Sequence, residues 1–368
     1  MKGTTMAATY GNNIKIDIYG GSHDEQIGVK MTGFPKDFKP DLDVLQKFLA
    51  RRAPGQNNLS TPRKEADAPV FLSGLTDGVT DGNELHAAIY NSNTRSSDYS
   101  FIYDTPRPGH ADFAALQKYG NSVDLRGGGH FSGRLTAPLC IAGGLAIQYL
   151  AARGITVGAH VASIADVKDA RFGTDISAEE LAHLTTMELP LLDTRKEEAM
   201  RERILTARAE GDSVGGVVEC AVIGLPAGLG EHMFAGVEGR VASLAFSVPA
   251  VKGVEFGAGF AASEMRGSEN NDVFRTDGKR VFTATNNCGG ILGGMTNGMP
   301  LVFRVAFKPT PSIAREQDTV SLTRMENTKL SIKGRHDPCV VLRAVPVVEA
   351  VAALAVLDLY LDPDAKEV

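Results

Sequence analysis

Glycine is concentrated in a few short clusters of this sequence, and these clusters limit what the chain can fold into. The chain has 40 glycines in 368 residues, well above the roughly 7% average. They gather in RGGGHFSG (126–133), GDSVGG (211–216) and NNCGGILGGMTNG (286–298), without the fixed period of a collagen helix. Apolar segments surround each cluster. The clusters therefore indicate tight loops of a globular fold, where the backbone approaches a ligand or another segment closely.

The overall composition and charge fit a globular protein with a sizeable core. Hydrophobic residues make up 43% of the chain and charged residues 22%, which are ordinary proportions for such a fold. The net charge of -6 argues against non-specific nucleic-acid binding driven by bulk charge. An anion-binding site would have to come from arginine and lysine side chains that gather locally.

The distribution of thiols and apolar residues favours a cytoplasmic protein. Four cysteines are scattered without a C-x-x-C pair, which is typical of a reducing compartment, and the first residues contain no apolar stretch of a secretory signal. The most apolar segment, residues 345–361, is interrupted by Glu349 and Asp358. It is shorter than the roughly 18–20 clean apolar residues of a membrane span. We expect a buried C-terminal helix and no membrane partner.

Helical and strand-like segments are intermixed without a regular period. Helices are expected over 40–52 with Asp41 as N-cap, over 134–154, over 193–211 and at the C-terminus. Strand-like runs cover 216–225, 251–256 and 301–307. The sequence shows no internal repeat and no linker rich in proline or serine. It predicts one large α+β domain over residues 1–368.

Several arginines lie on or beside glycine and proline turns rather than on a regular charged face: Arg51, Arg52, Arg63, Arg107, Arg126, Arg134 and Arg335. Arginine suits bidentate recognition of phosphate or carboxylate. Any one of them alone is better explained as a solvated surface charge or a helix-end cation. Together, in an acidic protein, they favour a small polyanionic ligand.

The histidines divide into two groups by context. His23 follows a strand-like run on a glycine turn, whereas His110 and His336 each stand beside an arginine and an aspartate. Histidine titrates near neutrality and suits proton delivery to a leaving group. His86, His160, His183 and His232 lack such context and are expected to be structural or on the surface.

Common cofactor and nucleophile motifs are absent or weak. GAGFAA (257–262) fits a loose G-x-G-x-x-A pattern, but no long amphipathic helix follows it. The chain has no G-x-x-x-x-G-K-[ST] phosphate loop and no G-x-S-x-G serine motif. Zinc is the alternative use of the histidines, but no H-x-x-x-H or C-x-x-C pair is present. We therefore expect no bound metal.

Taken together, these residues resemble the chorismate synthase family over almost the whole chain. The matching stretches are GGSH, RRAPGQNNLSTPRKEADAPVFLSG, RPGHADFAALQKYG, RGGGHFSGRLTA, EGDSVGG, PAVKGVEFGAGF, NNCGGILGGMTNG, KPTPSI and GRHDPCVVLRAVPV, in the family's order. The resemblance implies a β-α-β sandwich with helices between antiparallel sheets, and a homotetramer. It also implies a lyase of the shikimate pathway of aromatic amino acid biosynthesis. That enzyme forms chorismate by anti-1,4-elimination of phosphate from 5-enolpyruvylshikimate 3-phosphate, and it depends on reduced FMN.

The resemblance also assigns roles to individual residues. His110 matches the histidine that protonates the departing phosphate, His23 a histidine near the flavin, and Asp337 an aspartate that assists proton removal at flavin N5. Substrate or flavin phosphate is expected at Arg51, Arg52, Arg107, Arg134 and Arg335. Flavin contacts are expected at His130, Phe131, Ser132, Pro249, Ala250, Gly293, Lys308, Pro309, Thr310, Pro311, Ser312 and Arg335. Some family members also reduce their own flavin with NADPH, which makes NADPH a second candidate cofactor.

Two stretches depart from the family pattern. Gly21 and Asp24 replace a glutamate and a glycine beside His23, and residues 130–135 replace a loop that usually carries an arginine and two serines after the triple glycine. These departures keep two alternatives open. One is a divergent flavin-binding paralogue that acts on another phosphorylated cyclic acid, and the other is a non-catalytic ligand-binding oligomer.

Overall fold

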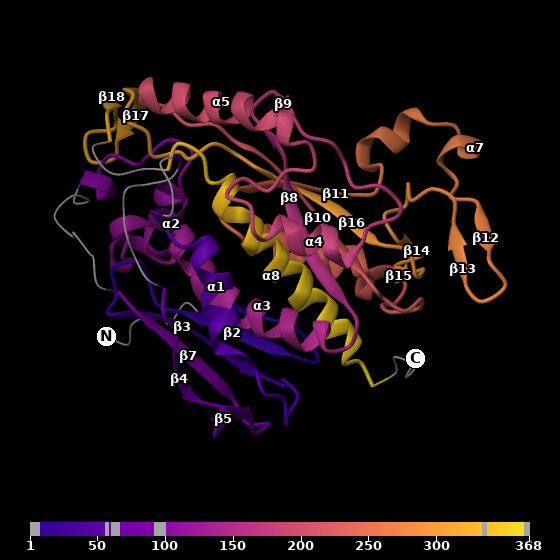
Figure 1. The fold of residues 1–368 in the computed structure, drawn as a ribbon. Helices are drawn as coiled ribbons and strands as arrows, with labels where there is room; N and C mark the ends of the chain where they lie inside the picture. Colours follow the sequence, from indigo (N-terminus) through magenta and orange to yellow (C-terminus); the bar gives the residue numbers. More distant parts are fainter. Residues whose placement is uncertain (1–7, 56–58, 60–66, 92–100, 333–336, 364–368) are drawn as a thin grey trace.

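Two antiparallel sheets of five strands each form the main strand layers of the part of the chain that the structure describes (Figure 1). The structure is a computed structural model, and it describes residues 8–55, 59, 67–91, 101–332 and 337–363. The first sheet has the order β1 (Ala8–Tyr10), β2 (Lys15–Tyr19), β3 (Gln26–Thr32), β7 (Leu85–Tyr90) and β4 (Val70–Ser73). The second has the order β11 (Val251–Phe256), β16 (Leu301–Phe307), β10 (Gly216–Ile223), β8 (Thr156–Ile164) and β9 (Val167–Lys168).

A row of charged side chains helps to set the register of the second sheet. Glu219 of β10 stands opposite His160 of β8 on one side and Arg304 of β16 on the other. His160 Nε2 lies 3.0 Å from Glu219 Oε2, and Arg304 Nη1 donates to Glu219 Oε1 at 3.0 Å. All three residues are buried. A shift of one residue would leave these charges unpaired in the core, so the row disfavours any other register.

A layer of helices lies between the two sheets, as predicted (Figure 1). Helix α3 contacts the first sheet, α8 contacts β8 and β10 of the second sheet, and α1 packs against both helices. Gly143 allows α3 and α8 to approach closely, because a Cβ there would lie only 2.2 Å from the Cβ of Ala350. The helices are α1 (Leu42–Arg52), α2 (Asp112–Tyr119), α3 (Thr136–Ala151), α4 (Ala178–Leu184), α5 (Glu197–Ala209), α6 (Val237–Ser247), α7 (Gly267–Asn270) and α8 (Val341–Tyr360).

The expected C-terminal helix is confirmed as a core element. Almost every side chain of α8 is buried, including Glu349 and Asp358. Within the described residues, none of the helices has the length and apolarity to cross a membrane. Asp41 also caps α1 as expected, since its side chain accepts hydrogen bonds from the backbone of Asp43 and Val44.

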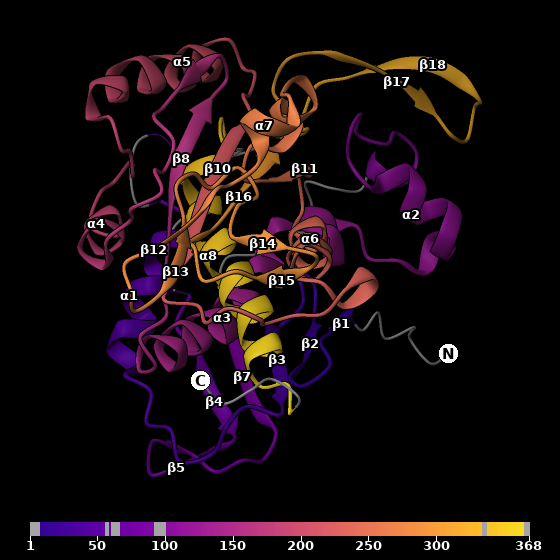
Figure 2. The same cartoon turned by 90° about the vertical axis from the view of Figure 1, so that its right-hand side faces the viewer.

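The shorter strands form hairpins at the edges of this sandwich. They are β5 (Leu75–Thr76) with β6 (Val79–Thr80), β12 (Phe274–Thr276) with β13 (Val281–Thr283), β14 (Ile291–Leu292) with β15 (Met295–Thr296), and β17 (Gln317–Ser321) with β18 (Glu326–Leu330). Figure 2 shows the β17–β18 hairpin on the same side of the molecule as α2. The two are linked, because Leu322 packs against a small apolar cluster around Ile102 and Leu116, separate from the main core. This cluster supports the loop that contains His110.

Candidate active site

A cavity of about 750 Å³ lies where the ends of several elements meet. It is lined by the C-terminal end of α1, the loop before α2, the segment that leads into α3, the end of α6 with the start of β11, the end of β16, and the first turns of α8. A volume of this size is typical of sites for small ligands and cofactors, which occupy roughly 300–1,000 Å³. These elements come from widely separated parts of the sequence, so only the folded chain forms the site.

The lining of the cavity is strongly cationic. Its charged side chains are those of Arg52, Arg107, Arg134, Lys252, Lys308 and Arg343, with two histidines, His110 and His130, and a single described carboxylate, that of Asp337. The long helices α3 and α8 also begin at this cavity. A helix N-terminus carries partial positive charge and unpaired N–H groups, which favour a bound anion. The cavity is therefore suited to a ligand with several negative charges.

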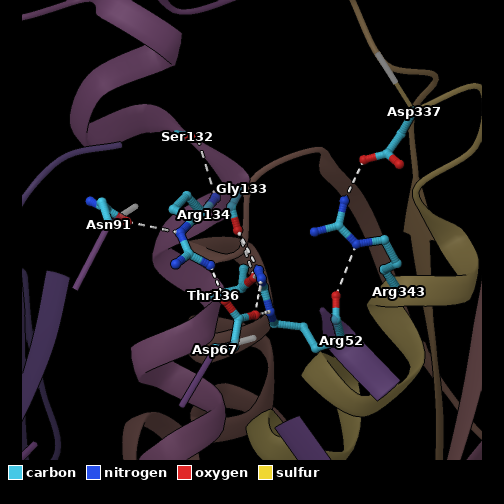
Figure 3. A network of polar contacts seen from close by, with 9 residues as sticks. All are labelled: Arg52, Asp67, Asn91, Ser132, Gly133, Arg134, Thr136, Asp337 and Arg343. Carbon is cyan, nitrogen blue, oxygen red and sulfur yellow. Dashed lines mark hydrogen bonds and ion pairs between the residues drawn. The ribbon is translucent and has the colours of Figure 1, made fainter. Parts of the chain in front are cut away.

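Two of these arginines are held in place by one buried carboxylate (Figure 3). Arg52 donates to Asp67 through Nε at 3.1 Å and Nη2 at 2.5 Å, and Arg134 pairs with the other oxygen of Asp67. Burial by itself raises the pKa of Asp67, but the two guanidinium groups hold this pKa below its usual value. Asp67 therefore stays ionised and positions both cations at the cavity wall.

Arg343 is a cavity cation that no sequence pattern singled out. Figure 3 shows it between two partners: Nε donates to the backbone carbonyl of Arg52 at 2.9 Å, and Nη1 donates to Asp337 at 2.5 Å. Burial lowers the pKa of Arg343, while Asp337 opposes this shift. The residue lies inside a matched motif, GRHDPCVVLRAVPV, and the signal that could have identified it is an arginine in the first turn of an otherwise apolar helix.

His110 stands at the cavity with an ordered polar environment. Its Nδ1 lies 2.7 Å from Oδ1 of Asp112, and Arg107 donates to both oxygens of the same carboxylate at 2.7 Å. Although burial raises the pKa of Asp112, the hydrogen bonds from Arg107 and His110 hold this pKa well below its usual range. Arg107 also reaches Ser312 across the cavity, with Nη1 3.3 Å from Oγ. The structure thus brings Arg107, His110 and Ser312 together.

His23 lies behind the cavity wall rather than in the lining. Ser22 Oγ donates to the carbonyl of Arg126 and lies 3.2 Å from Nδ1 of His23. The imidazole also lies against Gly127, which does line the cavity: a Cβ at Gly127 would be 2.3 Å from His23 Cε1. Gly127 has φ of +59°, a conformation that favours glycine. This glycine therefore allows His23 to approach the cavity.

The wall formed by β11 and the end of β16 carries a pair of lysines. Burial lowers the pKa of Lys308, and the charge of Lys252 lowers it further. A bound anion beside these lysines would relieve their repulsion. The buried hydroxyl of Thr310 has no hydrogen-bond partner among the described residues, and Thr310 also lines the cavity. Phe131, Phe246 and Phe307 add apolar surface. A flavin mononucleotide, with an apolar ring system and a phosphate, fits this combination of groups.

His130 contributes one defined hydrogen bond. Its Nδ1 lies 3.0 Å from the carbonyl oxygen of Gly20. A carbonyl only accepts hydrogen bonds, so Nδ1 carries the proton. The ring itself lines the cavity. His130 is thereby held between the glycine turn that precedes His23 and the cavity.

Most of the expected site residues meet in this cavity. They are Arg52, Arg107, His110, His130, Phe131, Ser132, Arg134, Pro249, Ala250, Lys308, Thr310, Pro311, Ser312 and Asp337. Pro309 belongs to the same segment but not to the lining. Arg51 lines a separate, smaller cavity of about 310 Å³, and Gly293 lies in the β14–β15 turn. Arg335 and His336 lie outside the described residues.

Comparisons with known proteins agree over nearly the whole chain. The family model described as chorismate synthase matches residues 14–361. A protein named chorismate synthase from Lancefieldella parvula is 46% identical over 365 residues, covering 96% of each chain. One from Methanosarcina acetivorans is 43% identical over 350 residues, covering 95% of this chain and 94% of that protein. A solved structure titled "Crystal Structure of Chorismate Synthase" has a TM-score of 0.75 at 27% identity, and the match covers 96% of this chain and 93% of the other.

Proposed function

This chain belongs to the chorismate synthase family, and we propose that the cationic cavity between its helix ends is the site of the family's reaction. The protein is a lyase that eliminates phosphate from 5-enolpyruvylshikimate 3-phosphate to give chorismate. Its substrate carries a phosphate and two carboxylates. The observation that carries the proposal is the lining itself, in which six arginine and lysine side chains face one described carboxylate. Such a lining compensates the charge of this substrate.

Substrate phosphate and carboxylates are held by the arginines of the cavity. Arg52 and Arg134 are positioned by Asp67, Arg107 by Asp112, and Arg343 by Asp337. Each guanidinium is thus oriented before a ligand arrives. Preorganised donors need little reorganisation during the reaction, which is how such groups contribute most to catalysis. Arg335 is the one expected substrate ligand whose position is not described.

Proton delivery to the departing phosphate is the role of His110. Its ring lines the cavity and is oriented by Asp112 and Arg107. As the carbon–oxygen bond breaks, its electron pair goes to the phosphate oxygen, and a proton from His110 stabilises that charge. His23 and Asp337 take part in the proton transfers around the flavin. Both residues lie at the cavity or directly behind its wall.

Dependence on reduced flavin follows from family membership. When bound, reduced flavin would supply an electron transiently and regain it, so that the overall reaction would involve no net oxidation. Lys252, Lys308 and Thr310 would hold its phosphate end, while Phe131, Pro249 and Ala250 would contact its ring system. His130 stands where an arginine is usual in the family. Its side chain would make the flavin contact that the arginine otherwise makes.

Further properties follow from the resemblance to the family. The chain would form one domain over residues 1–368 and assemble as a homotetramer in the cytoplasm, with NADPH as an additional reductant of the flavin. The continuous helix layer, which contacts both sheets, supports a single domain. The free thiols of Cys140, Cys220, Cys288 and Cys339 support a reducing compartment.

The experiment that tests the function is an anaerobic assay with purified protein. The substrate and chemically reduced FMN are added, and chorismate absorbance and phosphate release are followed together. We expect equal amounts of both products, formed only with reduced FMN. Flavin binding without product would favour a paralogue with another substrate. A protein that binds the substrate but neither binds flavin nor turns the substrate over would be a non-catalytic binder. The presence of His23, His110 and Asp337 disfavours that last outcome.

A further inference from the structure

Asp112 lies between Arg107 and His110 at the first turn of α2, and its side chain is completely buried. Its two oxygens have different sets of donors. Oδ2 accepts from the backbone N of Arg107 at 3.0 Å and from its Nε at 2.7 Å. Oδ1 accepts from Nη2 of Arg107 at 2.7 Å and lies 2.7 Å from Nδ1 of His110.

Two contacts of Nδ1 bear on which nitrogen of His110 carries a proton. An ionised carboxylate only accepts hydrogen bonds, so the contact with Oδ1 requires a proton on Nδ1. Nη2 of Arg107 also lies 3.1 Å from Nδ1. A guanidinium only donates, so this contact is a hydrogen bond only where Nδ1 is unprotonated. The contact with the carboxylate is the shorter of the two, and it favours the proton on Nδ1. In the neutral ring Nε2 is then the unprotonated nitrogen. Nε2 lies close to Gly128, where an added Cβ would be 3.4 Å away.

The loop that holds these three residues is itself anchored from the far side. Thr319 of β17 donates to the carbonyl of Pro106 at 2.6 Å, and Ser321 donates to Asp104 at 3.0 Å. Leu322 donates through its backbone to the carbonyl of Asp104. The β17–β18 hairpin therefore restrains the chain just before Arg107. Side chains on such a restrained loop keep their relative geometry, as an oriented proton donor requires.

We propose that Asp112 is a positioning residue for the elimination: it fixes His110 with one proton on Nδ1, so that Nε2 is the atom that passes a proton to the departing phosphate. In this step the Nε2–H bond of the imidazolium breaks, and the proton goes to the phosphate oxygen that has received the carbon–oxygen electron pair. The neutral ring keeps its Nδ1 proton. Asp112 remains ionised throughout and receives no proton. The catalytic part of this proposal rests on the proposed function, whereas the tautomer of His110 does not.

The substitution Asp112→Asn separates this role from a structural one. The amide oxygen keeps two hydrogen bonds from Arg107 at the Oδ2 position but only one at the Oδ1 position, so we expect it at Oδ2, with the bond from Nη2 of Arg107 lost. The amide nitrogen then takes the Oδ1 position and donates to Nδ1 of His110. Nδ1 becomes an acceptor, and the neutral ring carries its proton on Nε2. The wrong tautomer then faces the cavity, as is known for the equivalent substitution in serine protease triads.

The test combines nitrogen NMR of ¹⁵N-histidine-labelled protein with kinetics. The His110 signals are assigned from their loss in His110→Gln. We expect the Nδ1–H tautomer in the wild type and the Nε2–H tautomer in Asp112→Asn. The variant should lose about 10²–10⁴-fold in kcat, the usual range for a general acid, a larger factor than the change in the substrate dissociation constant that follows from the altered support of Arg107.

The matched control is Asp169→Asn. Asp169 is also a carboxylate hydrogen-bonded to a histidine Nδ1, that of His160 at 2.9 Å, but neither residue lines the cavity. The Asp169→Asn substitution should lower the thermal unfolding midpoint and leave kcat and the His110 tautomer unchanged. A neutral wild-type His110 with its proton on Nε2 would overturn the proposal, and this holds even if Asp112→Asn does not fold. Near-wild-type kcat in folded Asp112→Asn would overturn it as well. If the wild type makes no chorismate, the proposed function fails, and the tautomer still decides the role of Asp112.

Discussion

The guanidinium of Arg51 in α1 donates two hydrogen bonds to the carboxylate of Glu349 in α8, from Nη1 at 2.6 Å and from Nη2 at 2.9 Å. Glu349 is almost fully buried and also accepts from the backbone N of Ala159 in β8. The pair thus joins two core helices to the second sheet. Family resemblance places Arg51 among the phosphate ligands, whereas the structure gives it a partner inside the helix layer.

We expect Arg51→Met to lower stability rather than substrate affinity. It leaves Glu349 buried without its partner, which costs about 3–5 kcal/mol of unfolding free energy. The double variant Arg51→Met/Glu349→Gln should recover part of this loss. Urea unfolding and the KM for substrate measure the two effects. A rise in KM of tenfold or more with unchanged stability would instead assign Arg51 to the substrate. Arg203→Met, which breaks an exposed pair with Asp166, is the control and should change neither quantity.

Gly127→Ala should disturb the position of His23. The new Cβ would lie 2.3 Å from the imidazole, and the positive φ adds a strain of about 1–2 kcal/mol. We expect a folded protein with turnover reduced by about tenfold or more. Gly154→Ala is the matched control, because Gly154 has φ of +77° with nothing within 4 Å of a Cβ. Equal kinetic effects of the two substitutions would show that backbone strain alone accounts for the loss.

Flavin affinity should depend on pH through Lys308. Burial first, and Lys252 second, lower the pKa of Lys308 below its ordinary value. Because an anion binds the protonated lysine better, FMN binding should weaken as the pH rises through this lowered pKa, below about 10.4. Lys252→Met removes the repulsion and should move the transition to higher pH, and Lys308→Met should abolish it. Quenching of flavin fluorescence measures the dissociation constant. A dissociation constant that stays unchanged in the wild type as the pH is raised to about 10.4 would contradict this assignment.

Local patterns in the sequence predicted the parts of the fold that depend on neighbouring residues. Asp41 caps α1 because a short polar side chain before an amphipathic run satisfies the first free N–H groups. The apolar runs of β10, β11 and β16 are strands as expected. By contrast, α2 was not predicted, since it is short and follows a proline-glycine turn. Its stability comes from packing against the Ile102 cluster, which no local pattern reveals.

The candidate site was predicted only in part, for the same physical reason. The resemblance identified His110 and Arg52 as site residues, but not the partners that orient them. Asp67 lies 15 residues from Arg52 and pairs with Arg134 as well. Arg343 reaches the backbone of Arg52 across 291 residues. Such pairings are decided by the packing of helices and sheets, and neither periodicity nor spacing in the sequence indicates them.

The central claim is that the cationic cavity carries out the elimination with His110 as proton donor. The most direct test is turnover of 5-enolpyruvylshikimate 3-phosphate by His110→Ala with reduced FMN. His183→Ala serves as the control, since His183 lies on α4 and does not line the cavity. We predict that His110→Ala loses about 10²–10⁴-fold in kcat and still binds the substrate, while the control remains active. Turnover near the wild-type rate in His110→Ala would contradict the account.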